Sequence, residues 1–204
     1  MSEYRTIARD ASAEIEVKRS RFLCEVRRVE SEADARTFIE SVRKHRFDAR
    51  HHCTAFVIGP DFSLQRSNDD GEPAGTAGTP MLEVVTRREV SDVVAVVTRW
   101  FGGTLLGSGG LARAYGEVTG LALDHAGIQL RTLRHKMLVT TTVAEYGSLD
   151  SRLRTLGQVV DATHGAHTEI TVVVADPQAF VSEVARASGG RASVEILSPV
   201  WVDD

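Results

Sequence analysis

The alternation of apolar and polar residues divides the first quarter of the chain into a hairpin and a helix. Strands are predicted at 14–17 and 22–29, where apolar and polar residues alternate around the basic turn KRSR. An apolar stripe at helical spacing, from Ala35 to Val42, then follows Ser31, a residue type that caps helices. The pattern therefore predicts a β-hairpin followed by an amphipathic helix.

The middle of the chain continues with alternating strands and helices. Strands at 52–58 and 62–65 flank a Gly-Pro-Asp turn. A Thr-Pro pair predicts a short helix over 81–88 with Thr79 as its N-cap. The β-branched run DVVAVVT predicts a strand buried on both faces, and the apolar residues after Gly109 recur at helical spacing.

After Gly127 the pattern restarts in the order strand, helix, strand, strand, helix, strand. This order is that of the ferredoxin-like arrangement. The expected strands are 136–144, 159–163, 168–175 and 192–197, with helices over 146–156 and from Pro177 to Gly189. The pattern therefore predicts an α+β protein with two domains, residues 1–130 and 131–204.

The composition and the distribution of charge indicate where a charged partner would bind. With 204 residues, 42% hydrophobic and 25% charged, the chain has the composition of a globular protein and can bury a core. Its net charge of −4 is unevenly distributed, because residues 18–50 carry a balance of +4 and residues 137–204 a balance of −5. An anionic partner is therefore expected to bind the first domain.

The N-terminal sequence and the cysteines bear on location and on metals. No secretory signal and no run of about 18 apolar residues is found, so a cytoplasmic protein without a membrane segment is expected. Cys24 and Cys53 are interpreted as buried small hydrophobic residues. The string RHHC ending at Cys53 lacks the further ligands of a zinc site, so neither a metal nor a cofactor is expected.

Eight of the 17 glycines lie between Ser67 and Tyr115, in two glycine-rich segments. Glycine is favoured where the backbone takes positive φ or approaches another group closely, so both segments are interpreted as loops selected for shape. The first loop holds three carboxylates, Asp69, Asp70 and Glu72. These residues could close the loop by capping amides, contact a partner, or bind a divalent cation.

The second segment resembles a phosphate cradle, because a strand, five glycines and a helix N-terminus follow one another. It lacks both the Lys-Ser or Lys-Thr pair of the P-loop and the GxGxxG dinucleotide fingerprint. Arg99, Trp100 and Arg113 flank it and offer charge and a stacking face, which suits RNA or ribosomal contact, although Trp100 could equally anchor the core.

Nucleophilic catalysis is not supported by the sequence. Ser108 lies in GSGG, which is not the GxSxG elbow of hydrolases. His51 and Cys53 share one strand face, but no third group that would orient them is identifiable. No catalytic residue is therefore predicted.

Three strings carry a resemblance to a known family: RHHCTAFVIG, NDDGEPAGTAGTPML and VVTRWFGGTLLGSGGLARAY. They are similar to the signature of the YigZ/Impact family over roughly residues 15–125. The resemblance implies a first domain with the α/β sandwich fold of the second domain of ribosomal protein S5, followed by a ferredoxin-like domain. Eukaryotic relatives regulate translation by engaging a coactivator of a stress kinase. Bacterial members have no settled activity, so the family supplies no catalytic set.

The sequence therefore favours a non-enzymatic binding protein of the translation machinery or structured RNA, with the ribosome, RNA or a translation-associated protein as partner. A metal-assisted hydrolase using Asp69, Asp70 and Glu72, or a protein-interaction module, remains an alternative. The oligomeric state is not predicted. The expected contact residues are Arg50, His51, Asp69, Asp70, Glu72, Thr76, Arg99, Trp100, Gly102, Gly103 and Arg113.

Overall fold

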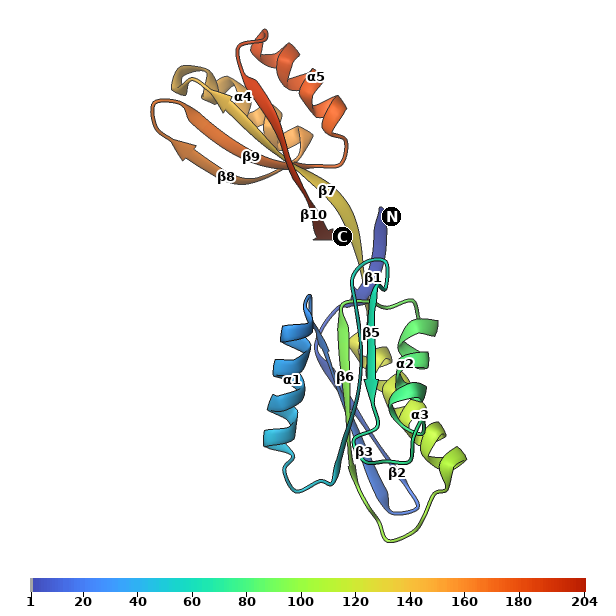
Figure 1. Ribbon diagram of the computed structural model, residues 1–204. Coiled ribbons are helices and arrows are strands. Elements are labelled where there is room, and N and C mark those ends of the chain that lie inside the picture. The colour runs from blue at the N-terminus through green and yellow to red at the C-terminus, as the bar shows by residue number, and fades with distance from the viewer. Residues whose placement is uncertain (1) are drawn as a thin grey trace. The chain divides into compact units, whose positions relative to one another are not determined.

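The computed structural model describes residues 2–204 and divides the chain into two compact units. The first unit contains residues 3–131 together with Asp204, and the second contains residues 132–203 together with Ser2. Each unit packs helices against an antiparallel sheet (Figure 1). The expected α+β class is confirmed.

The first unit is built on a five-stranded antiparallel sheet in the order β2-β3-β6-β4-β5. Helix α1 covers one face of this sheet, and α2 and α3 cover the other (Figure 1). The strands are β2 (Ala11–Val17), β3 (Ser20–Arg28), β4 (His51–Ile58), β5 (Leu64–Asn68) and β6 (Val93–Trp100). The helices are α1 (Glu32–His45), α2 (Gly78–Arg87) and α3 (Ser108–Ala126).

The central strand β6 explains why the run DVVAVVT has no polar face. Val94 and Val96 pack with Phe38 in the cluster under α1. Val93 and Val97 point to the other face and join the larger cluster under α2 and α3. Because helices cover both faces, every residue of the strand from Val93 to Arg99 is buried, as the pattern predicted.

The second unit has the strand order β8-β9-β7, with β10 also paired to β7. Together with the chain order this is the ferredoxin-like arrangement expected from the sequence. Its elements are β7 (Ile128–Thr141), α4 (Val143–Leu156), β8 (Gln158–His164), β9 (Thr168–Val174), α5 (Pro177–Ser188) and β10 (Ser193–Asp203). Asp176 caps α5, and Gly189 ends it with a left-handed φ of 61°.

Several strand bounds differ from the sequence predictions, among them β5 at Leu64–Asn68 and β10, which ends at Asp203 and not at residue 197; the largest differences are at β1 and β7. Strand β1 (Glu3–Ile7), which pairs with β7, was not predicted, and β7 begins eight residues earlier than expected, at Ile128. Polar contacts hold this part of the first unit, because buried Arg131 donates to the Tyr4 hydroxyl (2.7 Å) and to Glu30 (2.9 Å). A buried arginine breaks the apolar alternation, so the periodicity gave no strand signal there.

Cys24 and Cys53 are free thiols in the core of the first unit, with no exposed surface. Burial raises the pKa of each thiol to about 12, so both are protonated at neutral pH and are poor nucleophiles. Among residues 2–204, none of the helices combines the length and apolar character needed to cross a bilayer.

Candidate functional site

The two glycine-rich loops meet at one end of the sheet of the first unit. Antiparallel register pairs His51 at the start of β4 with Arg99 at the end of β6. The first loop follows β5 and leads into α2, while the second follows β6 and leads into α3. The sheet therefore places the ends of both loops beside the start of β4.

A pocket of about 310 Å³ opens where these loops meet. The start of β4 and the first loop supply one side, and the second loop with the beginning of α3 supplies the other. The lining residues are Arg50, His51, Glu72, Pro73, Arg99, Phe101, Leu105, Leu106, Gly107, Ser108 and Leu111.

A buried ion pair forms the floor of the pocket. Arg99 donates to Oε1 of Glu72 at 2.6 Å, and the two residues are only 5% and 9% exposed. The Tyr115 hydroxyl donates to the same oxygen at 2.7 Å. Burial, followed by the neighbouring Cys53 and Glu72, raises the pKa of Tyr115 far above its usual range, so its hydroxyl keeps the proton that it donates.

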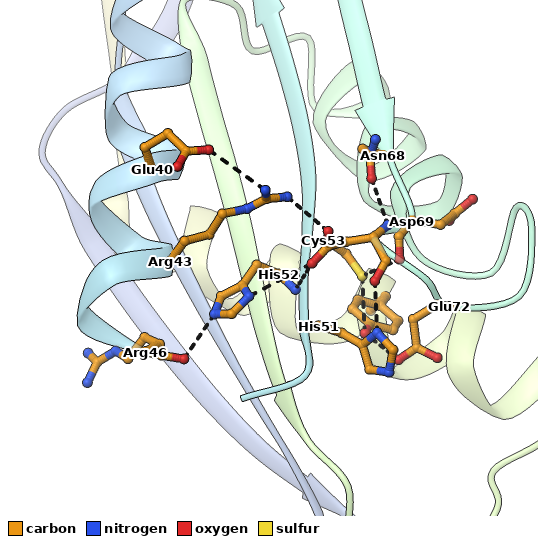
Figure 2. A network of polar contacts seen from close by, with 11 residues as sticks. Glu40, Arg43, Arg46, His51, His52, Cys53, Asn68, Asp69 and Glu72 are labelled. Carbon is orange, nitrogen blue, oxygen red and sulfur yellow. Dashed lines mark hydrogen bonds and ion pairs between the residues drawn. The ribbon is translucent and has the colours of Figure 1, made fainter. Parts of the chain in front are cut away.

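His51 is held by the backbone of the first loop (Figure 2). Its Nδ1 lies 2.8 Å from the carbonyl oxygen of Asp70, so Nδ1 carries a proton and donates. In the described chain, residues 2–204, Nε2 of His51 has no hydrogen-bond partner. Nε2 is therefore the free ring nitrogen of a residue that lines the pocket.

Cys53 does not act with His51 as a nucleophile. Its Sγ lies 3.0 Å from the carbonyl oxygen of Asp69 and 3.3 Å from the Tyr115 hydroxyl oxygen. The thiol is buried and its pKa is about 12. The side chain of Cys53 therefore packs behind the first loop and does not reach a substrate.

The three carboxylates of the first loop diverge to different partners. Asp69 accepts from the Gly75 N–H in the loop and from the Ala77 and Gly78 N–H groups at the start of α2. Glu72 pairs with Arg99. Asp70 accepts from Arg43 of α1 at 2.9 Å and from the backbone N–H of His52 at 2.7 Å. Within residues 2–204, no three His, Cys, Asp or Glu side chains are grouped so that they could hold a metal ion.

Helix α2 starts at Gly78, earlier than the predicted range 81–88, and a residue of the first loop caps it. The helix begins at Gly78 after Ala77, and Thr79 does not cap it. Asp69 supplies the cap from upstream, with its carboxylate 3.0 Å from the Ala77 nitrogen and 2.8 Å from the Gly78 nitrogen. A Cβ at Gly78 would lie 2.7 Å from the Asn68 nitrogen, so only glycine fits at this position.

Replacing Asp69 by alanine is expected to lower the free energy of unfolding by about 2 kcal/mol at neutral pH, because three backbone donors lose their acceptor. Burial disfavours the carboxylate, but the N–H groups of Gly75, Gly78 and Ala77 together lower the pKa of Asp69 below its ordinary value. A lowered folded pKa gives stability that is complete above the unfolded pKa and is lost as the pH falls. Urea denaturation at pH 7 and at about pH 3 measures both effects.

Thr79→Ala is the matched control for Asp69→Ala, because Thr79 is exposed and makes no capping bond. Its effect is expected to stay within about 0.5 kcal/mol. A loss at Asp69 no larger than that at Thr79, or one that is undiminished at low pH, would contradict the capping role.

The structure brings only part of the expected contact set together. Arg50, His51, Glu72 and Arg99 line the pocket. Gly102 and Gly103 begin the second loop beside it. The remaining five expected residues, Asp69, Asp70, Thr76, Trp100 and Arg113, are not among the pocket residues.

Thr76 and Trp100 have local structural roles. Thr76 is buried and donates to the Pro73 carbonyl oxygen at 2.7 Å. Trp100 follows Arg99 on β6 and so points to the opposite face, where its Nε1 donates to Asp48 at 2.8 Å. The guanidinium of Arg21 stacks on the Trp100 ring at 3.9 Å.

Arg113 lies apart from the pocket. It is exposed and lines a groove between α2 and α3 together with Arg87 and Arg88. No hydrogen-bond or ion-pair partner of Arg113 is found in the described part of the chain. The structure therefore separates it from Arg99, although the two residues flank the same loop in sequence.

Sequence reasoning missed the apolar rim of the pocket. Leu105 is 81% exposed and Phe101 is 49% exposed. The carbonyl oxygen of Leu105 accepts from Nζ of Lys18 at 3.3 Å, which links the second loop to the basic β2–β3 turn. The three large apolar residues of this glycine-rich loop, Phe101, Leu105 and Leu106, are the signal that could have identified this rim.

Comparison with known proteins shows likeness over both units. Residues 18–123 match the Impact N-terminal domain. The chain is 36% identical over 198 residues to the IMPACT family member YvyE of Bacillus subtilis, covering 96% of this chain and 91% of that protein. It is 41% identical over 192 residues to the IMPACT family member YigZ of Escherichia coli, covering 90% and 91%. A solved structure described as a hypothetical protein superposes with a TM-score of 0.70 at 33% identity, covering 97% and 98%.

Proposed function

The chain belongs to the IMPACT family, and on that premise we propose that it is a cytoplasmic, non-enzymatic binding protein of the translation machinery or of structured RNA. The observation that carries the proposal is the meeting of both glycine-rich loops at one end of the first unit's sheet. Three kinds of group gather there: arginines, exposed apolar side chains and the N-terminus of a helix. Such a surface suits a partner with phosphates and stacking faces.

The basic β2–β3 turn supports this proposal. Lys18 and Arg19 take left-handed φ values of 48° and 66°, which Asn and Gly adopt far more readily. Each such residue costs about 1 kcal/mol in backbone conformation. Lys18 is tied to the second loop through Leu105. Two basic side chains are thus held in a strained turn next to the rim of the pocket, which is consistent with selection for binding an anionic partner.

The geometry does not favour the metal-assisted hydrolase. Its three carboxylates point to α2, to Arg43 and to Arg99, so they do not converge on a common ion. The protein-interaction alternative keeps one observation in its favour, the exposed Leu105 and Phe101. The binding test distinguishes this alternative from RNA binding, because a complex with a protein partner would persist after nuclease treatment of the lysate.

The test compares Arg19→Ala and Arg50→Ala with Arg113→Ala in co-sedimentation with ribosomes and in anisotropy titrations of a structured RNA over a series of salt concentrations. Both side chains at the pocket end are exposed, so their removal should not unfold the protein. Each of these two substitutions is expected to weaken binding. Each should also reduce the slope of log affinity against log salt concentration by the amount that corresponds to about one phosphate contact. Arg113→Ala removes the same charge in the α2–α3 groove and is expected to change neither.

Equal affinities and salt slopes for the parent protein and all three variants would overturn the proposal. Arg99→Ala is unsuitable for this purpose, because it would break the buried pair with Glu72. Capture of a protein partner from nuclease-treated lysate, without any RNA or ribosome binding, would favour the protein-interaction alternative.

A further inference from the structure

Helix α3 presents an uncapped N-terminus to the pocket. The 19-residue helix begins at Ser108 after Gly107, without a side-chain cap and without an acidic residue in its first turn. Leu111 is the first residue whose N–H finds an acceptor, the Gly107 carbonyl oxygen at 2.9 Å. A Cβ at Gly107 or Gly109 would meet no atom within 4 Å. No side chain caps the amides at this helix start, and the helix dipole favours an anion there.

Arg99 provides an independent sign of a missing acceptor. It is 5% exposed, lines the same pocket as Ser108, and its Nε is buried without a hydrogen-bond partner. Its two terminal nitrogens are already engaged by Glu72 and by the Ser20 hydroxyl at 3.4 Å. Buried arginine nitrogens almost always have a partner, so Arg99 brings a guanidinium with one unsatisfied N–H to the wall of the pocket.

The charge of the pocket suits an anion. Among residues 2–204, Glu72 is the only carboxylate that lines it, and both Arg99 and the Tyr115 hydroxyl donate to that carboxylate. Arg50 has no hydrogen-bond or ion-pair partner among residues 2–204, so its charge is uncompensated. His51 contributes Nε2, a ring nitrogen that can form a hydrogen bond with a phosphate group.

The size and rim of the pocket limit the ligand further. A volume of about 310 Å³ exceeds what a bare phosphate fills and lies within the range of small-ligand sites. Phe101 and Leu105 offer an apolar face to a group attached to the phosphate. An internal phosphodiester continues on both sides, whereas a terminal phosphate presents three unsubstituted oxygens that can accept from the helix N-terminus and from the arginines together.

We infer that this pocket binds a terminal phosphate monoester carrying a base, as in a mononucleotide or at the 5′ end of an RNA. The phosphate lies at the α3 N-terminus beside Arg50 and Arg99, and the base packs on Phe101. The inference rests on the proposed function in taking the meeting point of the loops as the binding site.

The experiment compares two short RNAs of identical sequence, one with a 5′-phosphate and one with a 5′-hydroxyl, together with uridine 5′-monophosphate, in anisotropy and competition titrations. The phosphorylated RNA is expected to bind about tenfold more tightly or better. Arg50→Ala and Ser108→Asp are each expected to remove this preference. The aspartate would place a carboxylate at the helix N-terminus, which stabilises the helix and competes with the phosphate. Arg113→Ala, on the same helix outside the pocket, should keep the preference.

The outcomes separate this inference from the proposed function. Equal binding of the two RNAs by the parent protein would overturn the phosphate site and leave RNA binding in place. Binding of the mononucleotide without any RNA or ribosome binding would support the site and contradict the proposed function. A preference that survives both Arg50→Ala and Ser108→Asp would overturn the assignment to this pocket.

Discussion

Replacing Glu72 by leucine is expected to lower the free energy of unfolding by about 3–5 kcal/mol. The substitution leaves the guanidinium of Arg99, which is 5% exposed, without its counter-charge. It also removes the acceptor of the buried Tyr115 hydroxyl. Guanidinium chloride denaturation of the parent protein and the variant, followed by far-ultraviolet circular dichroism, measures the loss.

Two controls isolate the buried pair. The double variant Glu72→Leu with Arg99→Met removes both charges and is expected to recover most of the loss, since a buried ion pair is little better than a hydrophobic replacement of its size. Arg36→Ala breaks the exposed i,i+4 pair with Glu32 and is expected to cost under about 1 kcal/mol. A cost at Glu72 no greater than that at Arg36 would contradict the desolvated state of the pair.

The same pair links stability to the shape of the site. Glu72 belongs to the first loop and Arg99 to the end of β6, where the second loop begins. The contact therefore fixes the distance between the two loops and hence the width of the pocket. Variants at this pair would change binding and stability together, so binding is better tested at exposed residues such as Arg50.

The sequence predicted most elements because their patterns are local. The buried run of β6, the stripe of α1 and the cap of α5 each depend on residues within a few positions of one another. Strand β1 and the first half of β7 were missed because a buried polar network around Arg131 holds them. Its partners Tyr4 and Glu30 lie 127 and 101 residues away, so no local pattern records them.

The site was only partly predictable for the same reason. The glycine loops and the residues Arg50, His51 and Arg99 follow from composition and spacing. The role of Asp70 does not, because its partner Arg43 lies 27 residues away on α1. The opposite orientation of Trp100 and Arg99 is a local effect, because adjacent residues on a strand point to opposite faces. The contact role expected for both residues stays a prediction.

Replacing Gly102 by alanine is expected to cost about 3 kcal/mol of unfolding free energy. A Cβ at this position would lie 2.0 Å from the carbonyl carbon of Arg19 and 2.4 Å from the backbone nitrogen of Ser20. These are backbone atoms of the β2–β3 turn, so no side-chain rotation can relieve the overlap. The Gly102 N–H also donates to the Ser20 hydroxyl at 3.1 Å, a bond that the displaced loop would lose. Thermal and guanidinium denaturation measure the effect.

Gly103→Ala is the matched control, because this neighbouring glycine has a φ of +83° and would meet no atom within 4 Å. Its cost is backbone strain alone, about 1 kcal/mol. The difference between the losses of unfolding free energy for Gly102→Ala and Gly103→Ala thus measures how strongly the close packing of the second loop on the basic turn contributes to stability. Losses of equal size would contradict that approach. A larger loss at Gly102, accompanied by weakened RNA binding, would show that the backbone contact positions both loop and turn for the partner.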